Sequence, residues 1–126
     1  MKKIFSFSIL LSLLVALISI SGCSFSGLTV DEAKTNLTEA GYEVRVMNGG
    51  EYLDSDENEF QTIIEAELDY YLYATKGEDK IYMFFFVSTD VASNNYSFMN
   101  MDGLRSGQNN SVVYFGTKQA IKDSKI

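Results

Sequence analysis

The side chains best suited to chemistry lie in and just after an acidic segment, residues 51–59, which holds five acids and no base. Four oxygen-bearing side chains here follow the ligand spacing of a twelve-residue calcium loop, at its positions 1, 3, 5 and 12. These calcium candidates are Asp54, Asp56, Asn58 and Glu65. Position 6 of such a loop must turn sharply and normally holds glycine, but here it holds Glu59. We therefore favour a solvated acidic loop and predict no metal, with calcium as the alternative.

The chain contains few of the residue types that catalytic sites use. There is no histidine and only one cysteine, so Ser-His and Cys-His nucleophile pairs and histidine-based zinc sites are excluded. The sequence also lacks the glycine-rich loops that hold phosphates or dinucleotides. No spacing singles out a pair of acids for acid–base work. The sequence predicts neither an enzyme nor a cofactor.

The single cysteine, Cys23, ends an N-terminal segment with a distinctive pattern. A basic start is followed by an uncharged run over residues 4–20, and Ser21-Gly22 then precede the cysteine. Ile20-Ser21-Gly22-Cys23 resembles the lipobox of bacterial lipoproteins. The resemblance implies cleavage between Gly22 and Cys23, acylation of the Cys23 sulfur, and a cell-membrane location on the extracytoplasmic side. An ordinary cysteine after a plain signal or an uncleaved anchor is the alternative.

Domain organisation follows from that reading. Residues 1–22 are the expected signal peptide, residues 23–28 a lipidated tether, and residues 29–126 a single domain. The signal contains two of the ten Lys and Arg residues and none of the seventeen acids, so the mature chain carries a formal charge of −9. Such a charge argues against nucleic acid as a partner and leaves membrane lipid, contacted through acylated Cys23, as the means of attachment.

Hydrophobic patterning predicts an α+β fold in the order α-β-β-β-α-β-α. The expected helices are 30–40, 89–101 and 118–123, and the expected strands 42–46, 64–75, 80–87 and 111–116. The first helix begins with a Thr29-x-x-Glu32 capping box. A right-handed crossover would place the last strand parallel to strand 80–87. We expect a mixed, mainly antiparallel sheet of about four strands, with the helices mainly on one face.

Aromatic residues are abundant, with eight tyrosines and nine phenylalanines. Strand 80–87 is apolar on both faces, so it should be central and covered on both sides. On strand 64–75, alternation places Tyr71 and Tyr73 opposite Leu68, Tyr70 and Leu72. These rings either fill the core, which we favour, or leave an open row that could take a peptide, a glycan or a second copy.

The mature part also resembles small bacterial lipoproteins of uncharacterised function that pair an opening helix and strand with an aromatic hairpin and a Val-Val-Tyr-Phe-Gly-Thr ending. That resemblance implies a fold and no activity. We expect a non-enzymatic cell-envelope lipoprotein that binds an unknown envelope protein, peptide or glycan. The alternatives are a calcium-stabilised module and an accessory or immunity-type subunit that pairs through its sheet face or an open sheet edge.

Overall fold

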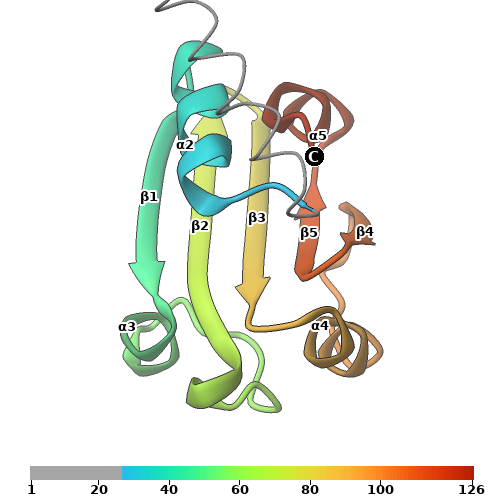
Figure 1. The fold of residues 1–126 in the computed structure, drawn as a ribbon. Coiled ribbons are helices and arrows are strands. Elements are labelled where there is room, and N and C mark those ends of the chain that lie inside the picture. The colour runs from blue at the N-terminus through green and yellow to red at the C-terminus, as the bar shows by residue number, and fades with distance from the viewer. Residues whose placement is uncertain (1–26) are drawn as a thin grey trace, which may run out of the picture.

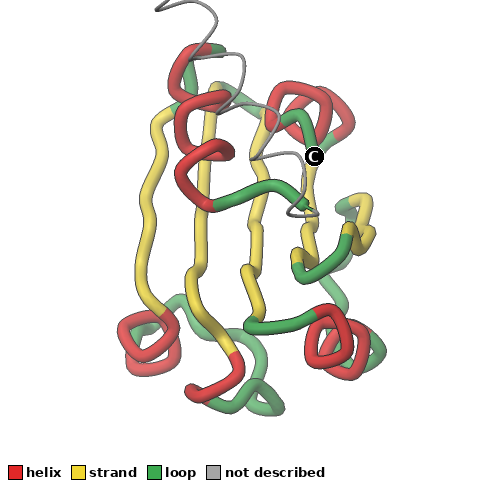
Figure 2. Tube along the Cα trace, in the orientation of Figure 1, coloured by secondary structure: helices red, strands yellow, loops and turns green. Residues whose placement is uncertain are grey.

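The computed structural model describes residues 27–126 and forms one α+β unit around an antiparallel sheet (Figures 1 and 2). Its five strands are β1 (Glu43–Asn48), β2 (Leu68–Lys76), β3 (Asp79–Phe86), β4 (Arg105–Asn109) and β5 (Val112–Gly116). Its helices are α2 (Val30–Glu39), α3 (Gly49–Asp54), the short 3-10 helix η1 (Glu65–Glu67), α4 (Thr89–Tyr96) and α5 (Lys118–Ser124). The strand order is β1-β2-β3-β5-β4. The predicted fold class is confirmed.

Helix α2 begins as the sequence predicts. The Thr29 hydroxyl accepts a hydrogen bond from the Glu32 amide, and the Glu32 carboxylate accepts one from the Thr29 amide. This reciprocal pair satisfies two amides that the first helical turn leaves without partners. Ala33 and Leu37 form the buried stripe that holds the helix on the sheet.

Two apolar clusters lie on opposite faces of the sheet. The α2-side cluster contains Ala33, Leu37, Tyr42, Leu72, Ala74, Ile81, Met83, Phe85, Val112 and Ala120. The α4-side cluster contains Tyr52, Phe60, Ile63, Leu68, Tyr71, Phe84, Phe86, Ala92, Met99, Val113 and Phe115. Strand β3 contributes to both, which confirms its predicted central, two-sided place.

The helices are shared between the two faces, which corrects the expectation that they cover mainly one. Helices α2 and α5 supply the α2-side cluster, whereas α3 and α4 supply the opposite one. The segment between α3 and η1 also contributes, through Phe60 and Ile63. The physical reason is β3 itself, because a strand with large apolar side chains on both faces needs cover on both.

The last strand, β5, is antiparallel to β3, so the parallel pairing expected from a crossover is wrong. An additional strand, β4, reverses the chain direction before β5 and pairs with it as a hairpin. Its sequence, Arg-Ser-Gly-Gln-Asn, has no apolar alternation, which is why we expected a polar loop there. An edge strand with little to bury does not need that alternation.

Two further boundaries differ from the sequence expectations. Residues 49–54 form helix α3 rather than the start of a solvated loop, and Asn48 with Glu51 make a second capping box. Helix α4 ends at Tyr96 instead of 101, because its asparagines and serines favour caps and turns over helix. A bulge between Leu68 and Tyr70 also moves Leu68 to the same face as Tyr71.

Candidate functional site

One row of planar side chains crosses the sheet and remains partly open to solvent. Arg45 of β1 lies opposite Tyr73 of β2, and Tyr73 lies opposite Tyr82 of β3. The two tyrosine rings stack with centroids 4.7 Å apart, and the Arg45 guanidinium lies 5.8 Å from the Tyr73 centroid. We call Arg45, Tyr73 and Tyr82 the tyrosine row.

The tyrosine row lies toward the end of the sheet that contains the β2–β3 turn, away from the helices on the same face. Figure 1 shows α3 and α4 at the other end of the strands. Both row tyrosines are half-buried, and the Arg45 side chain is 55% exposed. The row therefore leaves part of two aromatic side chains and a guanidinium open to solvent, a combination suited to binding an amphipathic partner.

A shallow hollow of about 250 Å³ adjoins the row at the outer edge of the sheet. It is lined by Glu43, Val44, Arg45, Tyr73 and Thr75. Charges of both signs stand beside an aromatic ring and a hydroxyl in this hollow, so it offers ion pairing, hydrogen bonding and apolar contact within a few ångströms.

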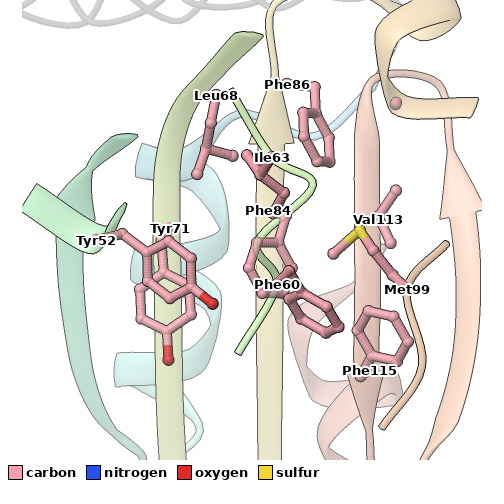
Figure 3. Packing of buried hydrophobic residues seen from close by; sticks show 11 residues of the cluster. Tyr52, Phe60, Ile63, Leu68, Tyr71, Phe84, Phe86, Met99, Val113 and Phe115 are labelled. Atoms are coloured by element: carbon pink, nitrogen blue, oxygen red, sulfur yellow. The ribbon is translucent and has the colours of Figure 1, made fainter. Parts of the chain in front are cut away.

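A second tyrosine pair lies next to the row on the same face but is buried. The rings of Tyr52 and Tyr71 stack with centroids 4.2 Å apart, and Phe84 packs on both (Figure 3). Residues 55–64, between α3 and η1, form what we call the covering segment. From this segment, Phe60 makes an edge contact with Phe84. This buried pair belongs to the core, and the tyrosine row packs against the same cluster.

Glu57 lies at the boundary between the two pairs. Its carboxylate forms an ion pair with Arg45 and accepts a hydrogen bond of 3.4 Å from the Tyr71 hydroxyl. Its own amide donates to the Ser55 hydroxyl at 3.2 Å, which fixes the local turn. The ion pair thus fastens the covering segment to the end of the tyrosine row.

Burial governs the acidity of these phenols. Burial raises the pKa of Tyr82 to about 12, with a further contribution from the neighbouring Tyr73. Burial likewise raises the pKa of Tyr52 to about 12, against the lowering effect of the hydrogen bond from the Glu59 amide. The pKa of Tyr71 is raised above the ordinary range by burial and then by the charge of Glu57. Near neutral pH these groups act as hydrogen-bonding phenols, not as bases.

The calcium candidates are not gathered into a ligand set. Asp54 ends α3 and Asp56 is exposed in the following turn, while Glu65 begins η1. The Asn58 side chain bonds its own loop, donating to the Leu53 carbonyl at 3.3 Å and accepting from the Phe60 amide at 3.0 Å. Among residues 27–126 no three acidic side chains are placed to hold a metal ion together. The calcium hypothesis gains no support from this geometry.

The predicted lipidation and cleavage residues, Gly22 and Cys23, lie outside the described part of the chain. Within that part, no helix is long and apolar enough to cross a membrane. The described chain begins at Gly27, beside the Asn110 side chain in the β4–β5 turn. Leu28 then packs on the α2-side cluster. The chain therefore enters the domain on the face opposite the tyrosine row.

The sequence indicated part of this site. Alternation along residues 42–46 places Arg45 on a polar face, and the aromatic surplus drew attention to Tyr73. Glu57 was one of several equivalent acids in its segment, and only the fold of that segment brings it to Arg45. Nothing in local sequence could have shown that contact across twelve positions.

Comparison with protein-family models, with curated proteins and with solved structures finds no match to this chain.

Proposed function

We propose that this protein is a lipid-anchored, extracytoplasmic binding protein without enzymatic activity, held by acylated Cys23, which takes a protein, peptide or glycan of the cell envelope at the tyrosine row. The observation that carries the proposal is the position of the row. It is partly exposed and lies on the sheet face opposite the one where the chain enters.

The short tether supports this arrangement. Cys23 precedes Gly27 by four residues, and four extended residues reach at most about 14 Å. An acyl group on Cys23 would hold the α2 side of the domain close to the membrane surface. The tyrosine row would then face away from the lipid, where an envelope partner can approach it.

Side-chain chemistry supports binding over catalysis. The row combines aromatic edges, neutral phenols and one guanidinium, which are groups common at recognition surfaces. No histidine is present in the chain to act on a bound molecule. A mature charge of −9 also disfavours direct adsorption to anionic lipid, so acyl chains are the appropriate attachment.

Anchoring is tested by palmitate labelling and membrane fractionation in intact cells. The wild-type chain should incorporate labelled palmitate and stay with the membranes after a salt wash, and Cys23→Ala should do neither. Ser24→Ala is the matched control and should behave as wild type. Retention of Cys23→Ala on washed membranes would contradict lipid anchoring.

Partner binding is tested with a photocrosslinking amino acid placed at single positions in otherwise unchanged cells. A crosslinker at Tyr82 should give a discrete adduct with an envelope component. One at Thr38, exposed on α2, should not. Arg45→Gln should weaken the Tyr82 adduct. Equal adducts from both faces, or none at Tyr82, would contradict the assignment of the binding surface.

A further inference from the structure

The outer edge of β1 is the longer open edge of the sheet. In residues 27–126 its only strand partner is β2, and Figure 1 shows no element beside its outer side. The opposite edge strand, β4, is one residue shorter and holds a single charge, Arg105. An open strand edge presents unpaired amides and carbonyls that can pair with another strand.

On the row face, the charges of the β1 side chains alternate in sign. Glu43 and Arg45 are two positions apart and both exposed, and Val44 between them points to the α2 side. When one copy of β1 lies antiparallel to another with Val44 opposite Val44, each Glu43 stands opposite an Arg45. A shift of one pair toward either end sets Glu43 against Glu43 or Arg45 against Arg45. One register is therefore favoured by charge and its neighbours are opposed.

We propose that β1 is a dimer interface, and that its occupant is the β1 strand of a second copy of this chain. In the pairing with Val44 at the two-fold axis, the two sheets join into one continuous sheet. Charge complementarity is the argument for a second copy over an unrelated partner, because the same two residues supply both halves of both ion pairs.

The two-fold axis of such a pair is perpendicular to the sheet. Both α2 sides then lie on one side of the dimer and both tyrosine rows on the other. The rows meet end to end across the interface, with each Arg45 next to the partner's Glu43. The hollow beside Tyr73 and Thr75 becomes the centre of a surface twice as long. Both chains also enter on the same side, so two lipid anchors could share one membrane.

Dimerisation changes the partner of Arg45. In the single chain its guanidinium pairs with Glu57, and in the dimer it stands opposite the partner's Glu43. Glu57 keeps its contact with the Tyr71 hydroxyl. Because one exposed ion pair replaces another, charge selects the register more than it adds affinity.

The first test uses charge reversals on the full chain, purified in detergent and studied by sedimentation. The wild type should dimerise, and Glu43→Arg and Arg45→Glu should each raise the dissociation constant by roughly tenfold or more, since each places like charges opposite at both symmetric contacts. An equimolar mixture of the two variants should recover the wild-type constant, because the heterodimer restores both opposite pairs. Lys34→Glu on α2 is the matched control and should leave the constant unchanged.

The second test uses disulfide formation in membranes. In the proposed register the two Val44 positions are direct neighbours, at a Cα separation that a disulfide can bridge. Val44→Cys should therefore form a crosslinked dimer on mild oxidation. Val46→Cys, on the same strand and face, should not, because two copies of that position lie about 14 Å apart along the strands.

Three results would overturn the proposal. They are a monomeric wild type over the whole concentration range, a mixture of charge variants no more dimeric than either alone, and crosslinking of Val46→Cys as fast as that of Val44→Cys. None of them bears on lipid anchoring or on binding at the tyrosine row of a single copy, which the palmitate and photocrosslinking experiments test separately.

Discussion

Two stacked tyrosine pairs lie side by side on one face of the sheet and have different surroundings. Tyr52 and Tyr71 are buried, whereas Tyr73 and Tyr82 are partly exposed. Both pairs have near-parallel rings, with interplanar angles of 25° and 26°. Stacking geometry therefore does not distinguish a core pair from a surface pair.

The difference lies in what covers each pair. Phe60, from the segment between α3 and η1, packs on Phe84 and Phe115 and closes the buried half. Glu57, near the start of the same segment, forms an ion pair with Arg45 and marks the border between the two pairs. A buried pair and a partly exposed pair of stacked tyrosines can thus be neighbours on one sheet face, because a single connection covers only part of that face.

The largest expected effect comes from removing one ring from each pair. Tyr71→Ala should lower the free energy of unfolding by about 3–5 kcal/mol, because a fully enclosed aromatic leaves a cavity. Tyr73→Ala should cost about 1–2 kcal/mol, since solvent already reaches that ring. Urea denaturation followed by circular dichroism measures both. Equal losses would mean that the open pair is as much a part of the core as the buried one.

A smaller effect on the free energy of unfolding is expected from a substitution in α3, the helix that contains Tyr52. A Cβ on Gly49 would clash with the Leu68 carbonyl oxygen, so Gly49→Ala must shift α3 and should cost about 1–3 kcal/mol. Gly50→Ala is the matched control. The nearest group to its Cβ would be the end of the flexible Glu65 side chain, which can move aside, and alanine suits a helix better by up to about 1 kcal/mol.

If Gly49→Ala proved as stable as Gly50→Ala, α3 would not be held against β2 as described. The thermal midpoints of the two variants, read in the same buffer, provide the comparison. The near-ultraviolet tyrosine signal should also change in Gly49→Ala, because Tyr52 moves with its helix.

Alkaline titration should affect both tyrosine pairs. The raised pKa of about 12 for Tyr52 and for Tyr82 means that the folded state favours the neutral phenols. Their contribution is fully present below about pH 10, the unfolded value, and is lost as pH rises toward 12. Urea midpoints should be flat from pH 7 to 9 and fall above pH 10. Tyr82→Phe should reduce that fall, and a decline beginning below pH 9 would contradict the assignment.

The smallest expected effect concerns the border between the pairs. Arg45→Gln and Glu57→Gln should each change the free energy of unfolding by about 0–1 kcal/mol, because the Arg45 side chain is 55% exposed and solvent screens the ion pair. A double-mutant cycle should give a coupling within the same range that shrinks in high salt. A coupling that survived high salt would show that the border is more enclosed than the exposure of Arg45 indicates.

Much of the fold could be predicted because the signals were local. The capping box at Thr29 and Glu32 located α2, and the continuous apolar run of β3 predicted a central strand with two covered faces. The pair Asn48 and Glu51 is a second capping box that marks α3, but the acids that follow it indicate a loop.

Other features depend on contacts that the local sequence does not encode. Strand β4 is polar and is ordered by pairing with β5, so no sequence pattern predicts it. Without β4, the predicted direction of β5 was also wrong. The bulge before Tyr70 changed which face Leu68 occupies. The ion pair between Arg45 and Glu57 forms only when a turn and a strand of the sheet come together. The lipidation site at Cys23 stays a prediction.

The strand order β1-β2-β3-β5-β4 has a consequence for a chain that is synthesised N-terminus first. Residues 43–86 contain the three strands of the meander β1-β2-β3, and until β5 is made the outer side of β3 is an exposed edge. This edge belongs to the most apolar strand of the sheet, and β5 covers it only after the rest of the chain has appeared. During that interval the unfinished protein is most prone to aggregate.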